Sequence, residues 1–295
     1  MPQELIVSSF NRYTARKKKL TMKLEQDAAL TSLDVLMAVC HRDDVHYLKK
    51  ALQSIRDQSL AANNVVLVID GPVPEDIVLA IGEFRNVLPI SVIQISENGG
   101  LANALNLGLS YCTSCYVARM DPDDIAMPQR FFEQVSYLTK HPEVSVCGSW
   151  IMEFSEITTD TYNKKLPVQH NDILKYARYR NPVAHPSVIF RRDDVVAAGG
   201  YPHFRTSQDF ALWSLMLKQG YLFHNLPQIL LKFRTTSLLQ QRRGLSYFIG
   251  EIKVFIFKKN IGQISFSQLL ISIIIYSIIR LSPHFFKKIL YEKLR

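Results

Sequence analysis

The sequence predicts an α/β fold built on a doubly wound, mostly parallel β-sheet, with a helical C-terminal extension. Short apolar runs recur from Asp34 onward, amphipathic stretches alternate with them, and polar or turn-forming residues bound each run. Short runs of this kind are typical of strands buried on both faces. Their alternation with helical segments is typical of a parallel sheet covered by helices on both sides. With 295 residues, 47% of them hydrophobic, the chain is long enough to bury a sizeable core.

The expected elements follow one another in strand–helix order. Strands are expected at residues 34–40, 65–70, 90–95, 116–120, 144–150, 187–190 and 221–224. Helices are expected at residues 45–58, 101–109, 128–140 and 209–219. In the first of these helices Leu48, Leu52 and Ile55 recur at helical spacing, and Pro128 occupies a first-turn position in the third.

The two ends of the chain differ from its middle. The formal net charge is +9, and basic residues gather near both termini. Residues 1–31 lack periodicity and are expected to form a flexible basic extension, residues 32–240 the main domain, and residues 241–295 a helical segment. The N-terminus has no apolar stretch of the kind found in signal peptides, and the four cysteines indicate reduced thiols. We therefore expect a cytoplasmic protein.

The C-terminal segment contains a strongly apolar stretch, Ser265–Leu281. Serine and glutamine interrupt it, and it is shorter than the ~20 mostly apolar residues of a membrane-spanning helix. It is expected either to lie on a membrane surface or to pack against the main domain. Lys287, Lys288 and Lys293 follow it and could meet anionic head groups. The membrane interpretation predicts a peripheral protein on the inner face of the cytoplasmic membrane.

Ligands of such sheets bind beyond the carboxyl ends of the parallel strands, and acidic residues stand there in this sequence. Asp70 closes the strand VVLVID and could accept a hydrogen bond from a base or a ribose. Asp121, Asp123 and Asp124 crowd the short loop after the strand YVARM. Crowded carboxylates repel one another unless a cation lies among them, and hard oxygen ligands select Mg²⁺ or Mn²⁺. The alternative interpretation is a solvated acidic turn.

A further acidic residue, Asp209, stands where the last expected helix of the main domain begins. A helix-capping role is one interpretation. The other is a general base that takes a proton from an acceptor hydroxyl, with the helix N-terminus favouring the ionised carboxylate. Three carboxylate sites in this order on one sheet favour the second interpretation.

These segments resemble successive motifs of family 2 glycosyltransferases, especially the bacterial subset that builds exopolysaccharide, capsule and lipopolysaccharide sugars. The resemblance runs from about Leu33 to about Arg234. The segments are DVLMAVCHRDDVHYLKKALQSIRDQ, VVLVIDG, ENGGLANALNLG, ARMDPDDIAMPQRF, NPVAHPSVIFRRD and GGYPHFRTSQDFALWSLMLKQG. The Asp-x-Asp loop and the Gln-Asp-x-x-x-Trp segment are specific when they occur together in this order.

The resemblance implies a GT-A fold, an inverting single-displacement mechanism, and a UDP-type nucleotide-diphospho-sugar donor with Mn²⁺ or Mg²⁺. By position in the motifs, Asp70 and Asp121 match nucleotide-binding residues, Asp123 with Asp121 matches the metal site, and Asp209 matches the catalytic base. The implied acceptor is a saccharide, in this subset a lipid-linked one. An anionic membrane surface is the expected partner, and no nucleic acid is expected.

Other positions carry less defined expectations. By the resemblance, Gly100 and Asn106 fall in the donor-side loop and helix and are expected to bind the nucleotide. His185 could approach the acceptor or the metal or be structural. The sequence also departs from the family. Gln208 replaces a common glutamate before the base, and Cys40 replaces an aromatic residue near the nucleotide base, which weakens the expectation of uracil. The Gln-x-x-Arg-Trp motif of processive synthases is absent from the sequence, so one sugar per encounter is expected.

Three rival interpretations remain to be weighed. A dinucleotide-binding oxidoreductase would carry G-x-G-x-x-G after the first strand, where this chain has Cys40-His41-Arg42-Asp43-Asp44. A sugar nucleotidyltransferase would carry a glycine-rich basic loop there, which is a poor match. The third is a non-enzymatic protein that binds membrane or nucleic acid through its basic ends. The Asp121/Asp123 pair argues against it.

Overall fold

The protein is described here by a computed structural model that covers residues 31–156, 161–235 and 245–281. The expected basic extension, the expected boundary at residue 240 and the lysine-rich stretch after residue 281 lie outside the described residues.

The N-terminal half of the sheet is parallel. β1 (Leu33–Val39) pairs with β2 (Asn64–Asp70) on one side and with β4 (Tyr116–Arg119) on the other, and β2 pairs with β3 (Ile90–Ile95). Every residue of β1 is buried, as its apolar run predicts. Because the strands are parallel, the chain leaves β2 and β4 at the same edge of the sheet, and the acidic residues are delivered there.

The second half of the sheet mixes directions. The full order is β3-β2-β1-β4-β8-β6-β9-β5, and β7 (Thr161–Lys164) pairs with β6 off this path. β6 (Val144–Phe154) and β9 (Leu222–Arg234) form a long parallel pair. β8 (Ile189–Arg191) and β5 (Ile125–Ala126) are antiparallel to their neighbours.

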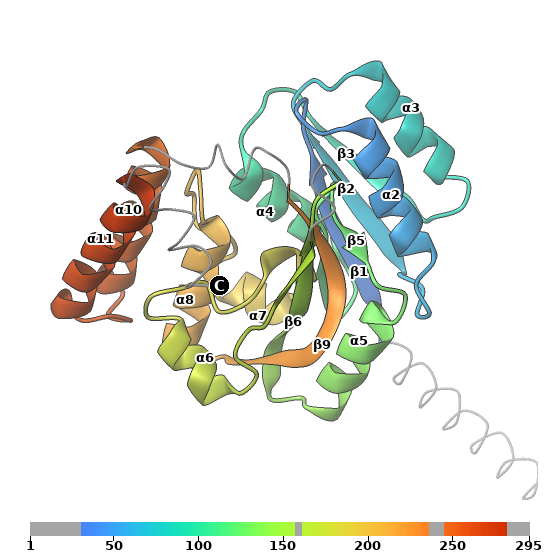
Figure 1. Ribbon diagram of the computed structural model, residues 1–295. Helices are drawn as coiled ribbons and strands as arrows, with labels where there is room; N and C mark the ends of the chain where they lie inside the picture. Colours follow the sequence, from blue (N-terminus) through green and yellow to red (C-terminus); the bar gives the residue numbers. More distant parts are fainter. Residues whose placement is uncertain (1–30, 157–160, 236–244, 282–295) are drawn as a thin grey trace, which may run out of the picture.

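Helices cover both faces of this sheet (Figure 1), which confirms the doubly wound α/β prediction. One hydrophobic cluster lies under α2 (Val45–Arg56), α3 (Glu75–Phe84) and α5 (Arg130–Lys140). The other lies under four helices, α4 (Leu101–Tyr111), α6 (His170–Tyr176), α7 (Arg192–Ala197) and α8 (Gln208–Lys218).

α4 approaches the sheet very closely at Gly108. A Cβ atom there would lie 2.4 Å from Leu36 Cδ1 and 2.8 Å from Val68 Cγ2. Glycine therefore allows the helix to lie flat on β1 and β2. This packing fixes the N-terminus of α4 beside the end of β2, where the donor-side loop was expected.

Two further helices follow the sheet. α10 (Leu245–Asn260) packs on α8, and α11 (Phe266–Leu281) packs on α10, as Figure 1 shows at the red end of the chain. A third hydrophobic cluster joins the three helices. Its buried members are Phe210, Ala211, Val254, Phe255, Ile264 and Leu269. The predicted helical C-terminal extension is confirmed, and over its described part it packs against the main domain.

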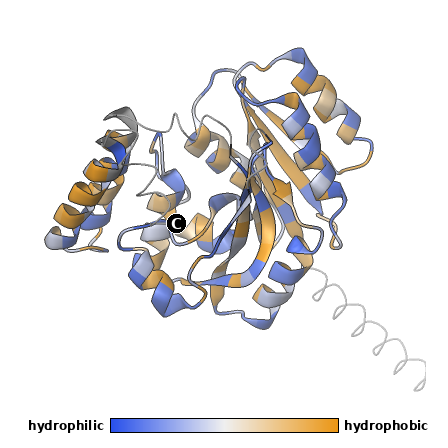
Figure 2. Ribbon diagram, viewed as in Figure 1, coloured by the Kyte–Doolittle hydropathy of each residue, from blue (hydrophilic) through white to orange (hydrophobic). Residues whose placement is uncertain are grey.

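One side of α11 remains exposed. Within residues 31–156, 161–235 and 245–281, no helix combines the length and apolarity needed to cross a bilayer. Yet large apolar side chains recur on α11 at helical spacing with 39–62% of their surface exposed, and Figure 2 shows the apolar character of this helix. We call Phe266, Leu270, Ile271, Ile274, Ile275 and Ile278 the apolar face of α11.

Several expected elements need correction. The strand expected at 221–224 runs from Leu222 to Arg234, and the one expected at 187–190 is a 3-10 turn at His185–Ser187 followed by β8. Helix α3 was missed, although Glu75 and Asp76 stand in its first turn.

Candidate active site

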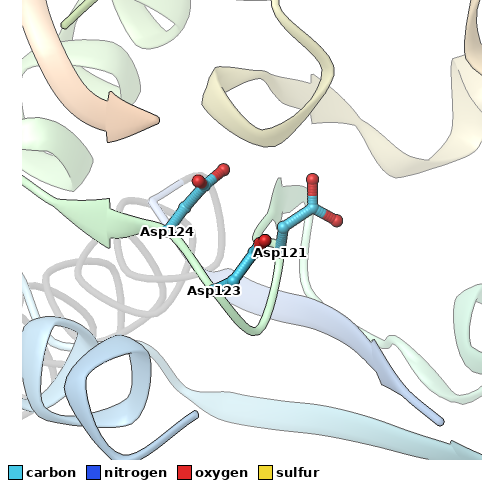
Figure 3. A group of neighbouring side chains, drawn as sticks. All are labelled: Asp121, Asp123 and Asp124. Carbon is cyan, nitrogen blue, oxygen red and sulfur yellow. The ribbon is translucent and has the colours of Figure 1, made fainter. Parts of the chain in front are cut away.

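The acidic loop Asp121-Pro122-Asp123-Asp124 follows β4 directly. Its three carboxylates extend to the same side of the loop (Figure 3), and one oxygen of each lies within 4.8 Å of the others. Asp121 and Asp123 are half-buried and Asp124 is fully buried. The structure thus brings together the two residues expected to hold a metal.

A backbone group of β9 anchors Asp124. Its Oδ1 accepts a hydrogen bond of 2.8 Å from the backbone N–H of Arg234, the last residue of β9. Its Oδ2 is buried and accepts no hydrogen bond within the described residues. Burial and the charges of Asp121 and Asp123 raise the pKa of Asp124 well above its usual value.

This carboxylate set fits a divalent cation. The oxygens are hard ligands, one from each residue lies within 4.8 Å of the others, and Oδ2 of Asp124 is buried without a hydrogen-bond donor among the described residues. Two positive charges among the three carboxylates would relieve the repulsion that raises the pKa of Asp124. Asp121 and Asp123 could provide its ligands.

Two arginines that the sequence interpretation did not single out hold this loop. Arg119 is fully buried and donates hydrogen bonds to the carboxylate of Asp121 and to the carbonyl of Met120. Arg234 donates through Nε to the carbonyl oxygen of Asp123 at 2.8 Å. The guanidinium of Arg234 also stacks 3.9 Å from the ring centroid of Tyr47.

Arg234 is fixed on its remaining sides as well. Its guanidinium lies 4.7 Å from the ring centroid of Phe154 and 2.6 Å from the carboxylate of Glu156. Because a planar guanidinium can stack and donate at once, it locks the acidic loop to the end of β9. The sequence offered no signal for this, since Arg234 ends a strand whose length was underestimated.

The donor-side loop is built around Asp70. Its Oδ1 and Oδ2 accept hydrogen bonds from the backbone N–H groups of Gly99 at 2.8 Å and Gly100 at 3.0 Å. Asp70 is 4% exposed, so the main role of its carboxylate is to hold the glycine loop in place. Gly100 has φ +85°, which favours glycine, and precedes the first turn of α4.

Asn106 lies in the middle of α4. Its side chain accepts from the N–H of Tyr201 at 2.7 Å and donates to the carbonyl of Tyr201 at 2.8 Å. Both polar groups of the amide are thus used to tie α4 to the segment before α8. The structure gives Asn106 this bridging contact, and its expected contact with the nucleotide stays a prediction.

Asp209 lies in the first turn of α8, as its second residue, and not at the cap. The cap is Ser207, whose φ of 59° is left-handed, an uncommon conformation for a residue with a side chain. The amide of Asn181 donates to Asp209 Oδ2 at 2.6 Å. Burial raises the pKa of Asp209; hydrogen bonds from the Phe210 N–H and Asn181 lower it, and the charge of Asp121 raises it.

The interaction of Asp121 with Asp209 relates the acidic loop to the expected base. The charge of Asp121 contributes to the raised pKa of Asp209, of Asp43 and of Tyr201, so all three groups lie near Asp121. Burial, with a contribution from Asp121, raises the pKa of Asp43. Cys40, at the expected nucleotide-base position, donates its N–H to Asp43 at 2.7 Å, and burial raises the pKa of its thiol.

His185 lies in the same neighbourhood but is enclosed. It is 9% exposed, its Nε2 is 3.1 Å from the hydroxyl of Tyr201, and its ring is 6.1 Å from that of Trp213. Burial, with a contribution from Arg119, holds the pKa of His185 well below its usual value. A neutral, enclosed imidazole of this kind fits the structural interpretation.

Comparison with known proteins agrees with this site. Residues 34–200 match the profile of the family described as "Glycosyl transferase family 2". An amylovoran biosynthesis glycosyltransferase of Erwinia amylovora is 38% identical over 260 residues, which cover 88% of this chain and 97% of the relative. A UDP-Gal:α-D-GlcNAc-diphosphoundecaprenol β-1,3-galactosyltransferase of Escherichia coli is 35% identical over 261 residues, covering 88% and 94%. The chain belongs to glycosyltransferase family 2.

Solved structures share the fold. The S. aureus protein TarS (residues 1–349), in complex with UDP-GlcNAc, has a TM-score of 0.63 at 13% identity, covering 84% of this chain and 72% of that one. A mannosyltransferase of Pyrobaculum calidifontis, in complex with GDP-Man and Mn²⁺, has a TM-score of 0.58 at 16% identity, covering 83% and 68%. The fold is therefore the predicted GT-A fold, and the protein is a glycosyltransferase.

Proposed function

We propose that this enzyme transfers one sugar at a time, with inversion, from a nucleotide-diphosphate donor to a lipid-linked saccharide in surface polysaccharide biosynthesis. One observation carries the proposal. In this family 2 chain, Asp209 lies close enough to Asp121 of the acidic loop for the charge of Asp121 to contribute to its raised pKa. A base and a diphosphate site that lie near one another are the two parts a single displacement needs.

In the proposed step, an acceptor hydroxyl oxygen attacks the anomeric carbon of the donor sugar. The bond from that carbon to the diphosphate oxygen breaks, and the hydroxyl proton passes to the carboxylate of Asp209. The products are the lengthened saccharide and a nucleoside diphosphate. Attack from the face opposite the leaving group inverts the anomeric centre. The raised pKa of Asp209 suits this role because it makes the carboxylate a stronger base.

Asp121 and Asp123 would hold Mn²⁺ or Mg²⁺, which would offset the negative charge of the diphosphate leaving group. Arg119 holds the Asp121 carboxylate in place, and Arg234 holds the Asp123 backbone. The donor is proposed to be UDP-type, since one relative is a galactosyltransferase that uses UDP-Gal and TarS was solved with UDP-GlcNAc. Gly99 and Gly100, ordered by Asp70, would form its nearby loop.

We place the enzyme on the inner face of the cytoplasmic membrane. The apolar face of α11 is exposed, and the sequence that follows carries Lys287, Lys288, Lys293 and Arg295. Apolar burial combined with basic residues suits an anionic lipid surface. A relative of this chain acts on a sugar linked to diphosphoundecaprenol, so a lipid-linked acceptor supports the same location.

The transfer step is tested with Asp209→Asn in the full chain. The variant is nearly isosteric, so it should bind UDP with Mn²⁺ like the native protein and lose ~10²–10⁴-fold in transfer rate, the usual contribution of a general base. The matched control is Asp193→Asn, because the side chain of Asp193 is 91% exposed. A parallel loss of UDP binding in Asp209→Asn would make Asp209 a binding or structural residue. A panel of UDP-, GDP- and CDP-sugars with and without Mn²⁺ identifies the donor.

The membrane surface is tested by sedimentation with vesicles of anionic or neutral phospholipid. Ile274→Glu should weaken binding to anionic vesicles, because it places a charge on the apolar face of α11. Leu79→Glu on α3 is the matched control, since Leu79 and Ile274 are both 60% exposed. If the native protein binds neither kind of vesicle, or if the two variants bind anionic vesicles equally well, the membrane proposal is wrong.

A further inference from the structure

The segment between α6 and the His185 turn contributes a side chain that contacts the proposed base. It carries Asn181, whose amide donates the 2.6 Å hydrogen bond to Asp209. Asn181 is not part of a helix or a strand, so its orientation depends on how the surrounding backbone is held. Residues 177–179 form a turn after the end of α6, so their carbonyl oxygens need partners from outside that helix.

The two C-terminal helices supply these partners. Lys258 of α10 donates through Nζ to the carbonyl oxygens of Ala177 at 2.7 Å and Arg178 at 3.1 Å. The hydroxyl of Tyr276, on α11, donates to the carbonyl oxygen of Tyr179 at 3.0 Å. Three consecutive carbonyls are thus bound from α10 and α11, two residues before Asn181.

The other side of Asn181 is held by the sheet. The amide of Asn225, on β9, donates to the carbonyl oxygen of Pro182 at 3.0 Å. Asn181 therefore lies between a backbone fixed by α11 and a backbone fixed by β9. Removing either anchor would free the residue that orients Asp209.

Lys258 is built into this arrangement and is not a surface residue. It is fully buried, and its Nζ lies 3.9 Å from the ring centroid of Phe210 and 4.7 Å from that of Phe255. Phe210 directly follows Asp209 and belongs to the cluster that joins α8 to α10 and α11. The same lysine thus contacts both the helix of the proposed base and the segment of Asn181. A buried lysine is costly unless its hydrogen bonds are made, which explains why both carbonyls are needed.

We propose that α10 and α11 are a positioning element of the transfer site, in which Lys258 and Tyr276 fix residues 177–179 and, through them, the hydrogen bond from Asn181 to Asp209. This deepens the proposed function, because it assigns the C-terminal helices a part in orienting the base. Lys258 and Tyr276 are positioning residues, since neither contacts Asp209 itself.

The first test needs no substrate. The side-chain amide signals of Asn181 are assigned in the ¹⁵N-labelled full chain by their loss in Asn181→Ala. Tyr276→Phe removes one hydroxyl and should shift or broaden these signals. Lys258→Met keeps the apolar stem, loses both hydrogen bonds and should do the same. Tyr111→Phe and Lys259→Met are the matched controls, because both residues are exposed, and they should leave the signals in place.

The second test is a double-mutant cycle on transfer, with the donor that the panel identifies and saturating Mn²⁺. Tyr276→Phe should lower kcat by roughly 10-fold, a part of what a positioned base contributes, while the donor KM stays unchanged. In the Asn181→Ala background the same change should have almost no further effect, since the positioned group is already gone.

Unchanged Asn181 signals in Tyr276→Phe, or rate effects that add to that of Asn181→Ala, would overturn the proposal. Tyr276→Phe carries the test even if Lys258→Met does not fold. The outcome is separate from that of the proposed base. If Asp209→Asn keeps full activity while the Asn181 signals move in Tyr276→Phe, the positioning element stands and the base assignment falls.

Discussion

Arg234 Nε donates a hydrogen bond of 2.8 Å to the carbonyl oxygen of Asp123, across 111 residues of chain. The contact joins the end of β9 to the acidic loop after β4. The same arginine also gives its backbone N–H to Asp124 at 2.8 Å. The geometry of the expected metal ligands therefore depends on a residue that would not itself touch the metal.

Arg234→Lys should weaken metal activation. Lysine keeps the charge beside Glu156 but loses the Nε donor and the stacking on Tyr47. Groups that orient metal ligands are typically worth ~10–100-fold in metal affinity, so half-maximal activity should need about 10-fold more Mn²⁺. Arg56→Lys, at an exposed ion pair with Asp57, should leave the Mn²⁺ titration unchanged. An unchanged titration in Arg234→Lys would exclude this role.

Asp123→Ala and Asp124→Ala should fail in different ways. Asp123 is a proposed metal ligand, so its loss should remove most turnover. Because its side chain is only half-buried, the thermal unfolding temperature should stay nearly unchanged. Asp124 is fully buried and accepts from the Arg234 N–H, so its loss should lower the free energy of unfolding by ~1–3 kcal/mol. Thermal denaturation and Mn²⁺-dependent transfer assays distinguish the two. Full turnover of Asp123→Ala in enzyme treated with EDTA would contradict the metal site.

Asn181→Ala should move the acid limb of the pH profile of kcat/KM to higher pH. A general base works unprotonated, so activity falls as the pH drops through the pKa of Asp209. Burial and Asp121 raise that pKa, while the Asn181 hydrogen bond lowers it, so loss of Asn181 should raise it further. Asn260→Ala, at an exposed position, is the control. An acid limb that stays in place would mean that this limb reports another group.

Lys258→Met should change how stability depends on pH. Burial lowers the pKa of Lys258 from 10.5 to about 6 in the folded protein. Between those values the unfolded chain binds the extra proton, so this group makes stability rise with pH, and the contribution is lost as pH falls toward 6. The slope is at most about 1.4 kcal/mol per pH unit. Chemical denaturation of native and variant protein at pH 6.5–9 should give curves that diverge, and parallel curves would contradict a neutral buried Lys258.

Much of the fold was predictable because its strands carry their own signal. β1 and β2 are continuous apolar runs with nearly every residue buried, and such runs have few alternatives. The long strand β9 was underestimated because its middle is interrupted by Pro227 and Gln228, both exposed. Its pairing with β6 decides its length, and long-range pairing leaves no local pattern.

The carboxylates of the site were predictable, and the groups that hold them were not. Asp121 and Asp123 stand two residues apart on one loop, so their proximity follows from the sequence alone. Arg119 is part of the strand that precedes them, and nothing in the strand pattern marks it as a contact of Asp121. Arg234 and Asn181 contact residues far from them in the sequence, and only the fold brings these pairs together. Asn106 was assigned to the nucleotide by its place in the family motif, and its hydrogen bonds to Tyr201 could not be read from that motif.

The bonds from α10 and α11 to residues 177–179 bear on how such enzymes can be recombined. A chimera that exchanges only the C-terminal helices would place foreign side chains opposite the three carbonyls that accept hydrogen bonds from Lys258 and Tyr276. The natural unit of exchange is thus discontinuous, made of the two helices together with the stretch from Ala177 to Asn181. A graft that carries both pieces should keep its catalytic rate, and one that cuts the chain at a single point should not.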